Sequence, residues 1–141
     1  VVPAPLNAAD PCNEPNTGDP FMIQMPPVEQ WLAELPFMTD TSYPNDFAVI
    51  MREVGTTVNL ACMGEVPASY FVPVPGTNYE VGTVQLDSSA GNGNCADGAQ
   101  YLTSSAPVGV IVGGYDYASS YGYAGGLAFA ELWEPPFDPP D

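Results

Sequence analysis

The sequence predicts an all-β fold, an antiparallel β-sandwich of about nine short strands with extended Pro-rich arms at both ends. Seventeen prolines and fourteen glycines in 141 residues are too many for a helical protein and fit short strands joined by turns. Turn signals recur at intervals of about 8–12 residues, the spacing typical of a sandwich or barrel. Because 45% of the residues are hydrophobic, one domain of this length has enough apolar side chains for a core.

Two segments without regular structure are predicted to flank the β-sandwich domain of residues 21–133. Residues 1–20 (VVPAPLNAADPCNEPNTGDP) and residues 134–141 (EPPFDPPD) are rich in proline and in acidic or amide residues, which is typical of extended arms. We expect these arms to pack against their own domain or against a neighbouring copy. Because the chain begins at Val1 without a methionine or a signal peptide, we expect it to be a processed product or a fragment of a longer protein.

In the first half of the domain, the predicted strands are short apolar runs bounded by turn residues. The first is residues 21–25 (FMIQM). Residues 27–35 (PVEQWLAEL) carry apolar side chains at helical spacing and predict a single helical turn. In residues 46–53 (DFAVIMRE) and 56–62 (TTVNLAC), alternate side chains are apolar and would face the core.

The second half continues the same pattern. Residues 69–74 (SYFVPV) and 79–86 (YEVGTVQL) are predicted strands joined by the turn PGTN, and residues 99–104 (AQYLTS) form the next strand. Residues 108–115 (VGVIVGGY) are apolar on both faces, which indicates a strand in the middle of a sandwich or sheet. The last predicted strand is residues 127–133 (LAFAELW).

The charge balance excludes several classes of function. The chain has 17 acidic residues, no histidine and one basic residue, Arg52, so its formal net charge is −16. Binding of nucleic acid or of anionic membranes depends on Lys and Arg, so we expect neither partner. No apolar run reaches the roughly 18 residues of a membrane span. Histidine-dependent, Schiff-base and P-loop chemistry are excluded and no serine lies in a G-x-S-x-G frame, so we expect no enzyme and no organic cofactor.

The three cysteines do not have the spacing of a metal site. Cys12, Cys62 and Cys95 are far apart and have no histidine beside them, unlike the ligands of structural zinc. We expect a disulfide between Cys62 and Cys95, which would close a loop across the middle strands and stabilise the fold by about 3 kcal/mol. Cys12 would then be a free thiol, or pair with another chain or with a segment outside this sequence.

Four tyrosines, spaced by glycine and serine, follow the VGVIV run: Tyr115, Tyr117, Tyr121 and Tyr123. Tyrosine rings are common in cores and at protein interfaces, and they also stack on sugars. We therefore consider these residues as core, as a contact with a subunit or partner, or as a platform for a glycan. Arg52 either is a strand residue that pairs with a nearby carboxylate or anchors an acidic group of a neighbouring copy.

A calcium site is a further candidate, in the loop DSSAGNGNCADG. Asp87, Asn92, Asn94 and Asp97 offer the oxygen ligands that Ca²⁺ binds, but the loop lacks the closing glutamate of an EF-hand. Asn and Asp also favour turns, so the same residues are consistent with an ordinary loop.

Six motifs occur in a recognisable order: PPVEQW (26–31), DFAVI (46–50), GTTVNL (55–60), GAQY (98–101), SAPVGVIV (105–112) and SYGYAGG (120–126). Together they resemble the C-terminal half of the N-terminal domain of the IgGFc-binding protein family, over roughly residues 22–130. Bacterial members look closer, because they commonly carry cysteines at the positions of Cys62 and Cys95, which supports the disulfide. The resemblance implies a secreted or cell-surface protein, of bacterial origin, with a non-enzymatic binding function.

Two functional hypotheses follow. The first is an extracellular structural or adhesive module that self-associates, for example as the subunit of a filament or surface appendage, with other copies of itself as partners. The Pro-rich arms, the unpaired Cys12 and the tyrosine segment motivate it. The alternative is a monomeric domain that binds a glycan or a host protein such as immunoglobulin.

Overall fold

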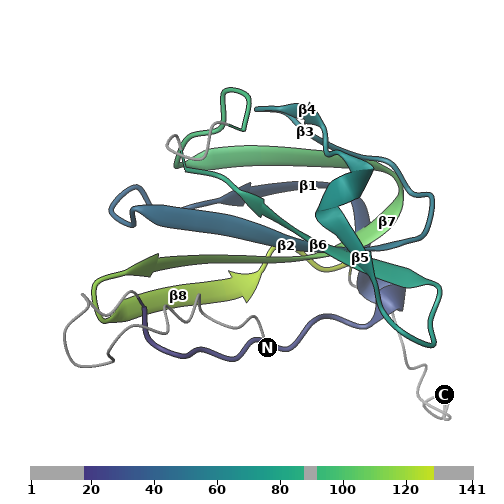
Figure 1. Ribbon diagram of the computed structural model, residues 1–141, viewed down its shortest axis with the longest axis horizontal. Helices are drawn as coiled ribbons and strands as arrows, with labels where there is room; N and C mark the ends of the chain where they lie inside the picture. Colours follow the sequence, from purple (N-terminus) through teal and green to yellow (C-terminus); the bar gives the residue numbers. More distant parts are fainter. Residues whose placement is uncertain (1–17, 88–91, 129–141) are drawn as a thin grey trace, which may run out of the picture.

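The computed structural model describes residues 18–87 and 92–128, and these residues form an all-β, antiparallel structure (Figure 1). The elements along the chain are η1 (Val28–Gln30), β1 (Leu32–Met38), β2 (Asn45–Glu53), β3 (Val58–Leu60), β4 (Gly64–Glu65), η2 (Ala68–Tyr70), β5 (Phe71–Pro73), β6 (Tyr79–Gln85), β7 (Ala99–Asp116) and β8 (Ser119–Ala124). The predicted all-β class is confirmed, with eight strands in one sheet among the described residues.

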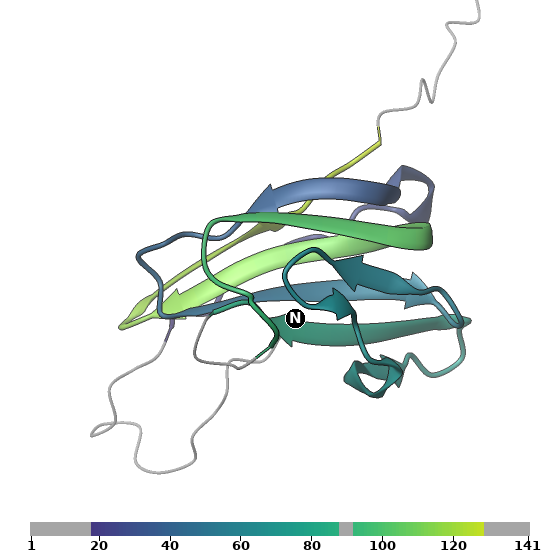
Figure 2. The same cartoon turned by 90° about the horizontal axis from the view of Figure 1, so that it is seen from above.

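Strand β7 is the central strand of the sheet and pairs with four other strands. It is 18 residues long, and in Figure 1 it runs across the top, curves over and returns beside β8. Its first half pairs with β1 and β3, and its second half pairs with β2 and β8. Strand β4 extends the first part through β3, while β6 and β5 extend the second part through β2. The sheet therefore curls over on itself in a sandwich-like half-barrel, which Figure 2 shows from above.

The sequence predicted two strands where β7 is continuous. Residues 99–104 and 108–115 belong to the same strand, with Pro107 between them. Proline cannot donate to a ladder, and the register with β1 shifts between Leu32, opposite Val108, and Glu34, opposite Thr103. The strand thus changes partners at Pro107 without ending there, because each half has its own neighbours.

The main core lies between the two parts of the curled sheet. Val108, Val110 and Val112 are at most 2% exposed and belong to this core, together with side chains from β1, β2, β3 and β6. Ile111 points to the opposite face, into a second cluster that includes Phe47. The apolar character of both faces of this strand, expected from the sequence, is confirmed.

The N-terminal segment covers the second face. Phe21, Ile23 and Met25 pack against the cluster of Phe47 and Ile111. Residues 21–25 were predicted as a strand, but they have no strand assignment, because their side chains dock onto the sheet while their backbone pairs with no ladder. The predicted single turn is present as η1 over residues 28–30, but residues 32–35 of the same segment belong to strand β1, which was not predicted.

Two further differences lie near the C-terminal end. Strand β8 was not predicted, because Gly and Ser in SSYGYA indicated a loop. Residues 127 and 128 of the expected strand 127–133 are not in a strand, and the remainder lies outside the described residues. Most of the N-terminal arm and the whole C-terminal arm also lie outside them, so these domain boundaries stay predictions.

A disulfide joins Cys62, just after β3, to Cys95, in the loop before β7. The predicted pairing is confirmed. The two residues are 33 positions apart, so the bond removes about 3–4 kcal/mol of loop entropy from the unfolded chain. Cys12 lies outside the described residues.

Candidate functional site

The structure places the four tyrosines of the candidate contact surface in different environments. Tyr115 is 6% exposed, and its ring centroid lies 5.3 Å from that of Phe47 and 5.7 Å from that of Phe21. Tyr117, in the turn between β7 and β8, is 70% exposed. The other two tyrosines are half-buried on β8 and pack against the main core. Of the four, Tyr117 alone presents most of its side chain to solvent.

Tyr121 and Tyr123 fasten β8 to the end of β1. They are two residues apart on a strand, so their side chains share one face. The Tyr123 hydroxyl accepts a hydrogen bond from the Met38 N–H at 2.9 Å and donates to the Met38 carbonyl. The Tyr121 hydroxyl accepts from the Asp40 N–H at 3.1 Å and donates to the carboxylate of Asp46. We call these four hydrogen bonds the tyrosine latch.

Asp46, the second residue of β2, is a fully buried carboxylate (0% exposed). Its Oδ1 accepts the Tyr121 hydrogen bond, and its Oδ2 has no hydrogen-bond partner among the described residues. Its pKa is raised to about 6, chiefly because burial disfavours the ionised form; the hydrogen bond from Tyr121 lowers it, and the charges of Asp97 and Asp40 raise it. Burial also raises the pKa of Tyr121, and the hydrogen bond to Asp46 adds to this effect.

The backbone of β7 at Gly114 lies directly against Asp46 and Tyr121. A Cβ placed on Gly114 would lie 2.5 Å from Asp46 Oδ1 and 2.4 Å from the Tyr121 ring. Only a glycine therefore leaves room for this carboxylate and this ring together. Asp46 is not among the site residues predicted from the sequence. The signal was present as an aspartate leading the apolar strand of the DFAVI motif.

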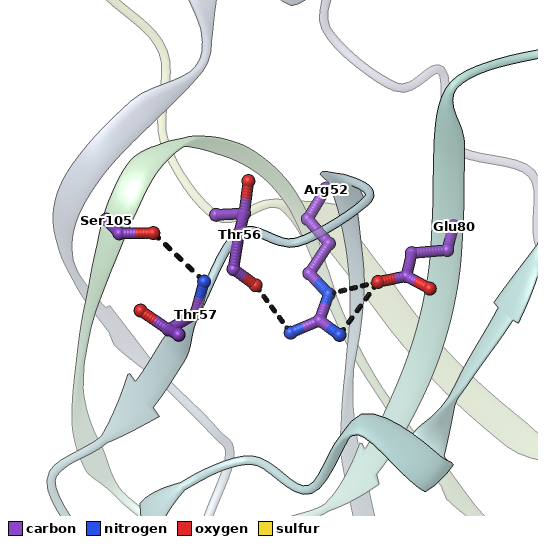
Figure 3. Close-up of polar contacts among 5 residues, drawn as sticks. All are labelled: Arg52, Thr56, Thr57, Glu80 and Ser105. Atoms are coloured by element: carbon purple, nitrogen blue, oxygen red, sulfur yellow. Dashed lines mark hydrogen bonds and ion pairs between the residues drawn. The ribbon is translucent and has the colours of Figure 1, made fainter.

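Arg52 lies at the far end of β2 and is 5% exposed. Its Nε and Nη2 contact Glu80 Oε1 at 2.8 and 2.7 Å, and its Nη1 donates to the Thr56 carbonyl at 2.6 Å, as Figure 3 shows. The guanidinium carbon also lies 3.4 Å from the centroid of the Phe71 ring. Arg52 thus pairs with a carboxylate on its own sheet, which was one of the two interpretations of this residue.

The same close-up shows how the chain beyond Arg52 is held (Figure 3). The Thr57 N–H donates to Ser105 Oγ at 2.9 Å, and the Ser105 N–H donates to the Thr57 carbonyl at 3.0 Å. These bonds hold the start of β3 beside the bend of β7. The hydrogen bonds around Arg52 and Thr57 therefore connect the two parts of the sheet.

The four candidate calcium ligands differ in their hydrogen bonds and in their burial. Asn92 donates to the Gln85 carbonyl at 2.9 Å and accepts from the Tyr70 hydroxyl at 3.0 Å. Asp97 is exposed, whereas Asp87 is 7% exposed. Asn94 uses its N–H to donate to the Cys62 carbonyl at 2.8 Å. Within residues 18–87 and 92–128, no three His, Cys, Asp or Glu side chains are grouped to hold a metal ion. Calcium binding stays a prediction.

The two 3-10 turns are the only helical segments of the described residues, and neither could cross a membrane. A family model described as "IgGFc binding protein" matches residues 6–114, which include Asp46 and Asp97 and end before β8. No curated protein and no solved structure matches the chain. The closer similarity to bacterial members stays a prediction. The match covers most of the 141 residues, and the chain belongs to the IgGFc binding protein family.

Proposed function

We propose that the chain is a non-enzymatic extracellular binding module, secreted by or displayed on a bacterial cell, with a contact surface centred on Tyr117. Membership of the family supports an extracellular binding role. The absence of histidine and lysine from the sequence supports the absence of catalysis. The observation that carries the proposal is the 70% exposure of Tyr117, in a segment whose other tyrosines are buried or half-buried.

The turn that holds Tyr117 is well supported. The β7–β8 ladder extends to the pair Asp116 and Ser119, and the Ser119 hydroxyl lies 2.6 Å from the Tyr43 hydroxyl. The Gly18 N–H donates to the Asp116 carbonyl at 2.7 Å. A side chain on a rigid support loses less conformational entropy when it binds, and tyrosine combines a large apolar ring with a polar end. The geometry therefore suits Tyr117 as an anchor for a ligand.

The charge of the chain favours a protein ligand with a basic surface. The net charge is −16, and the single cation, Arg52, already pairs with Glu80. Complementary charge accelerates encounter, and salt screens it. The family description makes the Fc region of IgG the first protein to test. A glycan stacked on Tyr117 is the alternative ligand.

A binding titration tests this function. Immobilised IgG Fc and a panel of glycans are titrated with the wild type and with Tyr117→Ala. Loss of an aromatic anchor typically costs about 2 kcal/mol, so the affinity should fall by about thirtyfold. Tyr101→Ala is the matched control, because Tyr101 is also exposed, at 42%, but lies on the first half of β7. Equal affinity of the wild type and Tyr117→Ala would contradict the proposal.

Self-association as a structural or adhesive subunit, in a filament or surface appendage, is the second candidate. It is favoured by the pairing of Cys62 with Cys95, which leaves Cys12 without a cysteine partner in this sequence. The charge of −16 on each copy opposes it, and residues 21–25 already cover their own sheet. Light scattering at rising protein concentration, with and without reductant and with Cys12→Ser, decides. A monomer under every condition rules this candidate out.

A further inference from the structure

Strand β8 lies beside the returning half of β7 and, among the described residues, pairs with no other strand (Figure 1). The Gly125 N–H, directly after β8, donates to the Val110 carbonyl at 2.8 Å. Because bonded and non-bonded pairs alternate in an antiparallel ladder, every second residue of β8 also bonds to β7. The backbone N–H and C=O groups of Ser120, Gly122 and Ala124 therefore point away from β7. We call these groups the free edge of β8.

Two other edge strands of the described sheet are protected against the addition of a strand. Strand β4 has only two residues and ends with Glu65. Strand β5 has three residues and ends with Pro73. The Val74 N–H donates to the Tyr79 carbonyl at 2.9 Å, so Pro73 stands where a residue faces away from β6, and proline has no N–H to offer there.

Strand β1 is protected as well. The Thr39 N–H donates to the Gly98 carbonyl at 2.9 Å, so Pro36 and Met38 face away from β7. Pro36 has no N–H, and the Tyr123 hydroxyl already bonds both the N–H and the carbonyl of Met38. Short length, charge and proline are the usual means by which sheets avoid pairing with other chains. The six residues of β8, SSYGYA, include no proline and no charged side chain.

We propose that the free edge of β8 binds an extended, positively charged segment of a partner protein as an additional strand. Asp19, Asp40 and Asp116 are in contact with β8. The single cation of the chain, Arg52, is bound to Glu80 on another part of the sheet, so it does not offset these charges. A segment with Lys or Arg complements them. A second copy of the chain would add the same aspartates and a net charge of −16, so it fits the edge less well.

This binding mode rests on the proposed function and specifies it. Tyr117 lies in the turn at one end of β8, so its exposed ring and the free edge can contact the same ligand. Backbone hydrogen bonds to an added strand provide affinity, and side-chain contacts provide specificity. The tyrosine latch fastens β8 to the end of β1, so the edge is already ordered before a ligand arrives.

Amide hydrogen exchange of the intact chain tests the edge. In the free protein, Gly122 and Ala124 should exchange faster than Tyr121 and Tyr123, which bond to β7. The probes are IgG Fc, a synthetic peptide of alternating lysine and valine, and a peptide of alternating glutamate and valine as the charge control. The lysine–valine peptide should slow the exchange of Gly122 and Ala124 by at least about tenfold, and the glutamate–valine peptide should not.

A proline substitution tests the hydrogen bonds directly. Ala124→Pro removes one donor from the free edge and keeps the bonds to β7, because an edge strand tolerates proline where its N–H faces outward. It should weaken binding of the lysine–valine peptide by about tenfold or more. Ala68→Pro is the matched control, because Ala68 is exposed and is the first residue of η2, where the fixed φ of proline fits. Its binding should equal that of the wild type.

Several results would overturn the added strand. They are equal peptide binding by Ala124→Pro and the wild type, equal protection by the glutamate–valine peptide, and protection that rises with protein concentration without a probe, because a second copy would then occupy the edge. If Tyr117→Ala weakens Fc binding and Ala124→Pro does not, the proposed function stands and the added strand is wrong. If Fc does not bind, or if Ala124→Pro does not fold, the exchange of the wild type with the two peptides still decides.

Discussion

Replacing Asp46 with asparagine should stabilise the protein at neutral pH, although the substitution alters a buried, hydrogen-bonded side chain. The pKa of Asp46 rises from 3.8 to about 6, chiefly because burial disfavours the ionised form. One pKa unit corresponds to about 1.4 kcal/mol, so ionisation of Asp46 in the folded protein costs about 3 kcal/mol. Asparagine avoids this cost and keeps an oxygen that accepts from Tyr121.

The sign of the pH dependence follows from the direction of the shift. The pKa is higher in the folded protein than in the unfolded chain, so the folded state binds the proton more tightly. The stability that this proton contributes is fully present below pH 3.8 and is lost as the pH rises through about 6. Asp46→Asn should show none of this dependence, and at neutral pH it should gain about 1–3 kcal/mol over the wild type, after allowance for imperfect packing.

Urea unfolding, followed by tryptophan fluorescence at a series of pH values, measures the difference. The net charge of −16 makes self-repulsion grow with pH in every variant, so the useful quantity is the wild-type stability minus that of Asp46→Asn at each pH. Asp19→Asn serves as the control for removal of one charge. A difference that stays constant between about pH 4 and about pH 7, or a variant less stable than the wild type at neutral pH, would refute the reasoning.

Three further substitutions probe the rest of the fold. Cys95→Ser removes the disulfide and should lower the free energy of unfolding by about 3–4 kcal/mol, measured by urea unfolding against the oxidised, disulfide-bonded wild type. Arg52→Ala leaves the mostly buried side chain of Glu80, 13% exposed, without its partner and should cost about 3 kcal/mol, whereas an exposed ion pair would cost less than about 1. Gly114→Ala places a Cβ 2.4 Å from the Tyr121 ring and should cost at least about 1–3 kcal/mol in the same assay.

Local patterns in the sequence predicted the all-β class, the inner strand VGVIV and the disulfide. Val110 and Ile111 face different clusters, so a run that is apolar on both faces was a reliable signal. The continuity of β7 was missed because a proline ordinarily ends a strand. Pro107 is tolerated inside β7 because the strand pairs with different neighbours before and after it. Strand β8 was missed because its serines and Gly122 indicate a loop, although Gly122 makes room for the ring of Phe21 on the sheet.

The buried carboxylate of Asp46 could not be predicted from local patterns. Asp46 looks like the polar start of an apolar strand, and its hydrogen-bond partner Tyr121 lies 75 positions away in the sequence. The burial of Asp46 depends on how the curled sheet brings β2, Gly114 of β7 and Tyr121 of β8 together. The exposure of Tyr117 could not be predicted from local patterns either. Only the fold shows that Tyr117 is exposed while the other three tyrosines of the segment are buried or half-buried.

The most direct test of the binding function is a map of the ligand's footprint. Amide chemical shifts of the labelled chain are recorded as IgG Fc is added, with Tyr117→Ala as the comparison. We predict that the largest changes cluster on residues 116–120 and the neighbouring Gly18, and that they disappear in the variant. Changes centred on the β5–β6 side of the sheet, or equal changes in the variant, would contradict the assignment of Tyr117 as the anchor.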